Sequence, residues 1–136
     1  MPIKPEGDDT WQDTPLDLTD ISYKELGDRL AYITGWLEFA ESRVGVAELK
    51  VTDATKALKE REASLLEEAD AKDKWKFDRL LPNDKVWAAR KFNLDVAEAY
   101  LTMTTRMLKK FEKGYGAISR EMTRRAKAVY TGPTGD

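Results

Sequence analysis

The chain of 136 residues contains neither cysteine nor histidine. Without thiols it can form no disulfide bond, no thiolate zinc site and no cysteine nucleophile. Without imidazole it lacks the usual general base of hydrolytic triads and the ligands of HExxH-type metal sites. No glycine-rich phosphate loop is present, and nothing around the paired carboxylates, such as Glu67-Glu68, indicates a pocket that would shift their pKa values. We therefore expect a protein with no enzymatic activity, no metal and no cofactor.

Long apolar runs are also missing. No segment approaches the roughly 18 consecutive apolar residues of a membrane span. The first residues contain no apolar stretch of the kind found in a signal peptide. We therefore expect a cytoplasmic protein that does not contact a membrane.

Charge is abundant but unevenly placed. Charged residues make up 35% of the chain, and the formal net charge is only −2. Residues 1–68 hold 16 acidic and 8 basic side chains, whereas residues 69–136 hold 9 acidic and 15 basic ones. This asymmetry favours a polyanionic partner for the second half of the chain. Pairing between subunits is an alternative use of the same charges.

The first 19 residues combine three prolines with several acidic side chains. Such a composition predicts a disordered acidic tail over residues 1–19, in which Trp11, Leu16 and Leu18 are candidate docking points. Ser22 and Glu25 then have the spacing of a capping box, in which a hydroxyl and a carboxylate satisfy free backbone N–H groups. A helix is expected to begin there.

Apolar residues recur at alternating steps of three and four from Tyr23 to Leu65, and only Arg61 interrupts the series. A 3.5-residue repeat sustained over about six heptads predicts coiled-coil packing against another helix. The positions are Tyr23, Leu26, Leu30, Ile33, Leu37, Ala40, Val44, Ala47, Val51, Ala54, Leu58 and Leu65.

Leu81-Pro82-Asn83-Asp84 predicts a break and a restart, because a proline disfavours helix in the residue before it. A second long helix is expected from about Asp84 to Tyr130. Its predicted inner stripe is Val86, Ala89, Asn93, Val96, Tyr100, Met103, Met107, Phe111, Tyr115, Ile118, Met122 and Val129. Large apolar residues spaced by seven widen this stripe, and an isolated hairpin would leave part of that surface wet. We assign them to an oligomer interface: Trp87, Leu94, Leu101 and Leu108.

The predicted fold is therefore all-α: a long antiparallel helical hairpin with coiled-coil packing that assembles into a homo-oligomer. The hairpin domain spans residues 20–130 with a break near 69–83, and residues 131–136 form a flexible C-terminal tail.

Basic residues are the main candidates for a binding site. The last helix carries a cluster opposed only by Glu112 and Glu121. A second set near the break interleaves basic and aromatic side chains. Cations beside aromatic faces are what sequence-tolerant single-strand binding requires. The candidate residues are Lys74, Trp75 and Lys76 near the break, and Arg106, Lys109, Lys110, Lys113, Arg120, Arg124 and Arg125 on the last helix.

A structural interpretation of both sets remains open. Trp75 would then plug the end of the hairpin. The basic residues would oppose the helix macrodipole near its C-terminus, where positive charge is favourable.

Short segments in a matching order resemble the UvsY family of bacteriophage recombination mediators. The resemblance covers about residues 32–124. It is carried by Trp36-Leu37, Ala57-Leu58-Lys59-Glu60-Arg61, Leu81-Pro82-Asn83-Asp84-Lys85 and Gly114-Tyr115-Gly116-Ala117-Ile118. It implies a helical protein that loads a RecA-like recombinase onto single-stranded DNA in the host cytoplasm. It also implies a closed homo-oligomer of about six or seven subunits.

The resemblance implies that Lys59 and Arg61 bind single-stranded DNA, since they match the family's basic pair. Two features depart from the family: the longer acidic tail, and the acidic residues around this pair, which include Glu60 and Glu62. Two other hypotheses stay open. In one, the chain is a structural or adaptor coiled coil, such as a phage assembly factor, that does not bind nucleic acid. In the other, the acidic tail competes with DNA for the basic surface.

Overall fold

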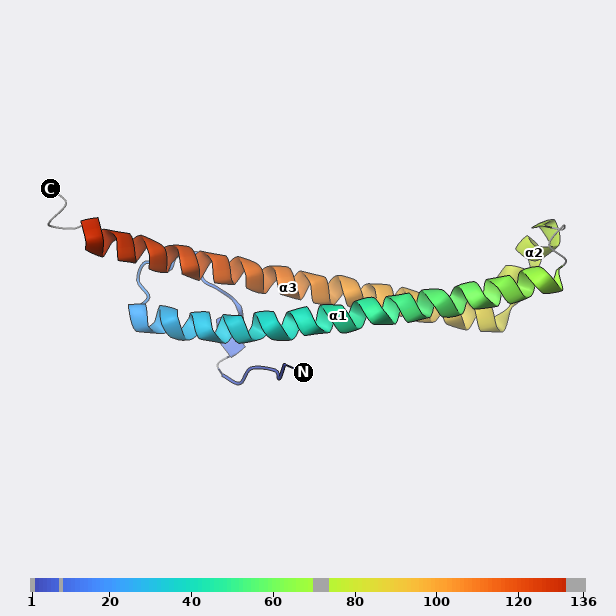
Figure 1. The fold of residues 1–136 in the computed structure, drawn as a ribbon, viewed down its shortest axis with the longest axis horizontal. Coiled ribbons are helices and arrows are strands. Elements are labelled where there is room, and N and C mark those ends of the chain that lie inside the picture. Colours follow the sequence, from blue (N-terminus) through green and yellow to red (C-terminus); the bar gives the residue numbers. More distant parts are fainter. Residues whose placement is uncertain (1, 8, 70–73, 132–136) are drawn as a thin grey trace. The chain divides into compact units, whose positions relative to one another are not determined.

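The computed structural model describes residues 2–7, 9–69 and 74–131, and it confirms an all-α helical hairpin (Figure 1). A short 3-10 turn at Asp9–Gln12 precedes the long helix α1, Tyr23–Glu68. The short helix α2, Lys74–Leu80, and a 3-10 turn at Leu81–Asn83 lead into the second long helix α3, Lys85–Thr131. α1 and α3 pack antiparallel to each other. Of the predicted C-terminal tail, residues 132–136 lie outside the described part.

Both long helices begin where the sequence predicts. At the start of α1, the backbone N–H of Glu25 donates a hydrogen bond of 3.1 Å to the Ser22 hydroxyl. At the start of α3, the backbone N–H of Trp87 donates to an Asp84 carboxylate oxygen at 2.7 Å. In each case a short polar side chain satisfies a backbone donor that has no partner within the helix.

The chain divides into two compact units, and the first contains residues 1–42 and 105–136. Its core joins the beginning of α1 to the end of α3. Trp36 stacks on Phe111 with ring centroids 5.2 Å apart, and Trp36 also meets Phe39 edge to face. The buried cluster consists of Leu18, Leu26, Tyr32, Ile33, Trp36, Ala40, Phe111 and Ile118. The predicted seam of α1 is confirmed here at Leu26, Ile33 and Ala40, which are fully buried, whereas its first predicted member, Tyr23, is 58% exposed.

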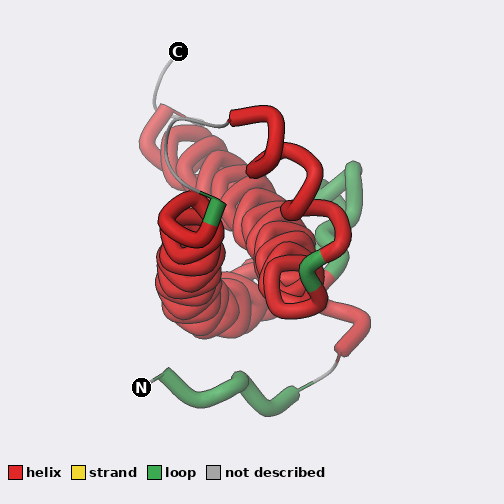
Figure 2. The backbone as a smooth tube through the Cα atoms, turned by 90° about the vertical axis from the view of Figure 1, so that its right-hand side faces the viewer, coloured by secondary structure: helices red, strands yellow, loops and turns green. Residues whose placement is uncertain are grey.

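The second unit, residues 43–104, continues the same seam of α1 with Ala47, Leu58 and Leu65, all of which are buried. Figure 2 shows the two long helices nearly end-on. On the α3 side the inward residues differ from the predicted stripe. Leu94 is 7% exposed, whereas Met103 is 61% exposed.

The oligomer interface predicted at Trp87, Leu94, Leu101 and Leu108 stays a prediction, although two of these residues pack within the chain. Leu94 is buried within the chain, and Leu108 packs against the core of the first unit. Trp87 and Leu101 are half-buried. The face of α3 that remains exposed includes part of the predicted inner stripe, namely Val86, Val96 and Met103, together with Phe92.

In the first unit the predicted stripe is confirmed at Phe111 and Ile118, which are buried. In the second unit two polar residues on the inward face explain why the sequence pattern points to the other side of α3. Thr104 is buried, and its hydroxyl donates to the carbonyl oxygens of Tyr100 and Leu101. Arg90 donates a 2.7 Å hydrogen bond to the carbonyl oxygen of Ala57 on α1. Because these groups find partners, a face that looks less apolar in the sequence can be buried.

The N-terminal segment lies against the first unit, although its composition predicts a disordered tail. Trp11 meets Tyr32 edge to face with centroids 6.0 Å apart, and the guanidinium of Arg29 lies 5.0 Å from the centre of the Trp11 ring. Leu18 is part of the buried cluster, whereas Leu16 is fully exposed. Apolar contacts thus hold a segment that its acidic charge would otherwise favour leaving in water.

None of the helices within the described residues is both long enough and apolar enough to cross a membrane.

Candidate nucleic-acid interface

Most of the basic residues on the last helix share one face of α3. Apart from the adjacent pair Lys109 and Lys110, they recur at steps of three, four or seven residues, which places them along a single side of an α-helix. We call this set the basic stripe: Arg106, Lys109, Lys110, Lys113, Arg120, Arg124 and Lys127. Phe111 and Ile118 are buried on another side of the same helix, which leaves the basic stripe facing solvent.

The members of the stripe differ in what they contact. Among the described residues, Arg106, Lys109 and Lys113 are exposed and make no ion pair. Lys110 forms an ion pair of 2.8 Å with Asp13 of the N-terminal segment. Its ammonium also lies 5.7 Å from the centre of the Phe111 ring. The stripe therefore offers several cations that are available to an anionic partner.

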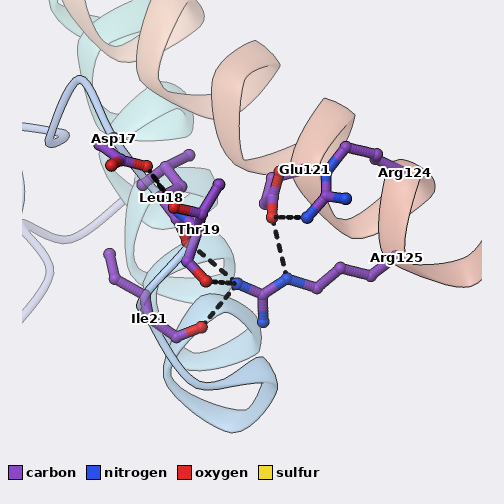
Figure 3. A network of polar contacts seen from close by, with 7 residues as sticks. All are labelled: Asp17, Leu18, Thr19, Ile21, Glu121, Arg124 and Arg125. Carbon is purple, nitrogen blue, oxygen red and sulfur yellow. Dashed lines mark hydrogen bonds and ion pairs between the residues drawn. The ribbon is translucent and has the colours of Figure 1, made fainter. Parts of the chain in front are cut away.

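Arg124 and Arg125 form a separate network with Glu121 at the end of α3 (Figure 3). Arg124 donates two hydrogen bonds to the Glu121 carboxylate, at 2.7 and 2.9 Å. Arg125 donates a third at 3.0 Å. These bonds hold the pKa of Glu121 at about 2, well below its usual range. Arg124 remains mostly exposed, so it can still face a phosphate.

Arg125 has a structural role that the sequence does not reveal. Its Nη2 group donates to the backbone carbonyl oxygens of Leu18, Thr19 and Ile21, at 2.9, 3.2 and 2.7 Å (Figure 3). Its side chain is largely buried. Arg125 therefore fastens the N-terminal segment to α3, and we leave it out of the candidate binding surface.

A groove runs between the N-terminal segment and the basic stripe. Residues 13–16 form one wall, and Lys110, Lys113 and Arg120 line the other side together with Gly114 and Ala117. The groove has a volume of about 520 Å³. Gly114 permits the close approach, because a Cβ atom at this position would lie 2.5 Å from the Thr14 hydroxyl.

The predicted pair Lys59 and Arg61 lies on α1 in the second unit, and its two members have different surroundings. Lys59 is exposed. Arg61 donates two hydrogen bonds to the Asp84 carboxylate, at 2.7 and 2.8 Å, and its side chain is three-quarters buried. The interruption of the α1 seam therefore has an internal partner, which is the same residue that caps α3.

Next to this pair, the indole N–H of Trp87 donates to a Glu62 carboxylate oxygen at 3.2 Å. The start of α3 is thereby joined to the end of α1 by two polar contacts. This arrangement gives Arg61 and Trp87 structural roles in the hairpin.

The Arg61–Asp84 contact predicts a pH dependence of stability. The Arg61 guanidinium and the Trp87 backbone N–H lower the pKa of Asp84 from 3.8 to about 2. Because the folded-state pKa is the lower one, the stabilisation is present above about pH 4 and is lost as the pH falls toward 2. We expect Asp84→Asn to reduce proton uptake on unfolding in this window by about one proton, measured by urea unfolding at stepped pH.

Glu121→Gln is a useful companion variant, because Glu121 has a similarly lowered pKa in the other unit. It should remove a separate part of the acid sensitivity. An Asp84→Asn protein with an unchanged pH profile would contradict the assignment.

The aromatic candidate Trp75 lies on α2 and is 68% exposed. The guanidinium of Arg79 lies 4.7 Å from the centre of its ring. Lys76 and Asn83 line a shallow pocket with these two residues. Trp75 is therefore not a plug of the hairpin core. The side chain of Lys74 lies outside the described residues.

Among the described residues, no group of three or more acidic side chains is arranged to hold a metal ion. Comparison of the chain with protein-family models, with curated proteins and with solved structures finds no match. The resemblance to UvsY therefore stays a prediction, and the functional argument depends on the residues described above.

Most members of the basic stripe can be predicted from the sequence, because they follow from helical spacing alone. It misses the contacts of the N-terminal segment with Lys110 and Arg125. The first of these joins residues 13 and 110, and the second joins residues 18–21 and 125. No local pattern reports a contact over such a separation.

Proposed function

We propose that this chain is a non-enzymatic protein that binds single-stranded DNA through the basic stripe of α3. The supporting observation is the row of exposed cations from Arg106 to Lys127 along one helix face. Such a row follows a phosphate backbone without reading sequence. The exposed ring of Trp75 provides a second element of single-strand recognition, because aromatic faces stack on any base.

The resemblance to UvsY extends this proposal. It suggests that the protein acts as a recombination mediator, loads a RecA-like recombinase onto the strand and works as a ring-like homo-oligomer. On the same ground Lys59 is a separate candidate for contact with the strand. Arg61 is not, because its guanidinium is paired with Asp84.

Binding to single-stranded DNA should depend steeply on salt. Each phosphate contact contributes about 0.7 to the slope of log affinity against log salt, because a bound phosphate releases its counterions. For about five contacts, affinity should fall about 100-fold between about 50 and 200 mM salt. Titration of a fluorescent oligonucleotide by anisotropy measures this slope.

An alternative function is that of a structural or adaptor coiled coil. The exposed apolar residues Phe92, Val96 and Met103 on α3 favour it, because they form a second helical stripe on the outside of the hairpin. In that case the oligonucleotide would not bind even at low salt. High salt would instead dissociate an oligomer, which sedimentation velocity would detect.

A further inference from the structure

The N-terminal segment makes further contacts within the first unit besides the ion pair between Asp13 and Lys110. We call its described residues, 2–7 and 9–17, the N-terminal strap. The ammonium of Lys4 lies 5.7 Å from the centre of the Trp36 ring. Gly7 packs against the ring of Tyr32, where an added Cβ atom would lie only 3.0 Å from a ring carbon. The strap therefore covers two large aromatic side chains of α1.

The covered aromatic side chains adjoin the basic stripe. Trp36 stacks on Phe111, and Lys110 of the stripe lies over the ring of Phe111. The carboxylate of Asp13, in the strap, forms an ion pair with the ammonium of Lys110. A carboxylate of the strap thus pairs with one cation of the stripe, and other residues of the strap lie against the aromatic rings of Tyr32 and Trp36.

The covered surface also contains polar groups without partners. The hydroxyl of Tyr32 and the indole N–H of Trp36 are both buried, and neither makes a hydrogen bond among the described residues. A buried donor with no acceptor lowers stability relative to its hydrated state. The burial of these two polar groups beneath the strap is therefore not compensated by hydrogen bonds. Opening would let both groups bind water or a ligand.

We propose that the N-terminal strap is displaceable and covers a latent nucleic-acid site formed by Tyr32, Trp36 and Lys110. This inference rests on the proposed function of the basic stripe and adds its regulation. Phosphates of the strand replace the Asp13 carboxylate at Lys110. Bases stack on the uncovered aromatic rings, and their polar edges accept hydrogen bonds from the Tyr32 hydroxyl and the Trp36 indole.

The ligand class is single-stranded nucleic acid, because its unpaired bases are free to stack on aromatic side chains. The clamp between Arg125 and residues 18–21 lies beyond the strap, so it holds the start of α1 in place while the strap opens.

An engineered disulfide bond between the strap and α3, which can be reduced again, provides the test. A Cβ atom at Gly114 would lie 3.5 Å from the Cβ atom of Thr14. Disulfides join Cβ atoms about 3.5–4.5 Å apart. Because the chain has no cysteine of its own, Thr14→Cys with Gly114→Cys creates one thiol pair and no competing bridge. Oxidation fixes the strap on α3, and reduction releases it.

We expect the oxidised form to bind a fluorescent oligonucleotide at least about tenfold more weakly than the reduced form at about 50 mM salt. Loss of one phosphate contact at Lys110 accounts for about that factor. Thr14→Cys alone is the matched control and should bind equally under both redox conditions. Circular dichroism should show the same helicity in both forms.

A second arm separates stacking from charge. An oligonucleotide with abasic sites keeps its phosphates but has no bases to stack. It should bind the reduced form more weakly than the normal strand does, whereas the oxidised form should discriminate less between the two.

Equal affinity in the oxidised and reduced forms would overturn the strap and leave the basic stripe standing. Failure of the cysteine pair to oxidise would place the strap elsewhere and would also overturn the inference. If no form, including the wild type, binds the strand at low salt, the proposed function fails together with the strap.

Discussion

The double variant Lys109→Glu, Lys113→Glu is expected to bind single-stranded DNA about 100-fold more weakly than the wild type at about 50 mM salt. Both side chains are exposed on the basic stripe and make no ion pair among the described residues. At this salt each lost phosphate contact removes about one power of ten in affinity. The reversed charges add repulsion to this loss. Anisotropy titration measures the change.

The salt slope provides an independent readout of the same variant. It should decrease by about 1.4, which corresponds to two lost contacts. Lys24→Glu is a suitable control, because Lys24 is exposed on α1 of the same unit and is not part of the stripe. It changes the net charge by the same amount per substitution. Equal losses of log affinity per substitution in the control and the stripe variant would show that overall charge, and not the stripe, determines binding.

Phe111→Ala is expected to lower the free energy of unfolding by about 3–5 kcal/mol. Phe111 is 1% exposed, and it is stacked on Trp36 at the centre of the first unit. Its removal takes away both the transfer free energy of the ring and the contacts of the atoms around the resulting cavity. Urea unfolding followed by circular dichroism measures the change.

The same helix offers a matched control. Phe92 is 66% exposed on α3, so Phe92→Ala should change the free energy of unfolding by less than about 1 kcal/mol. A large effect at Phe92 would show that the exposed face of α3 is covered in solution. A small effect at Phe111 would contradict the packing of the first unit.

The local signals in the sequence predict the helices well. Ser22 and Asp84 mark the starts of α1 and α3 because each satisfies a backbone donor close by in the chain. The α1 seam is also predictable, since its apolar residues follow one uninterrupted repeat up to Leu58. These features depend on residues within a few positions of one another.

The inward face of α3 in the second unit could not be predicted in the same way. Two stripes of similar apolar content compete, and the buried one contains Thr104 and Arg90. Their burial becomes acceptable only because Tyr100, Leu101 and Ala57 supply carbonyl acceptors in the folded chain. The role of Arg61 depends equally on a residue of another helix. Polar side chains that are covered because they find an acceptor, in their own helix or elsewhere in the chain, are thus the part of this fold that a hydrophobic pattern cannot place.

The clamp of Arg125 has a consequence for which substitutions the protein can tolerate. Its acceptors at residues 18, 19 and 21 are main-chain carbonyl oxygens, which every amino acid possesses. The side chain at position 19 can therefore vary without loss of the hydrogen bond from Arg125. Position 125 has no such freedom, because a lysine cannot reproduce the fork of a guanidinium. Positions 18, 19 and 21 can thus be substituted without loss of this contact, whereas position 125 cannot.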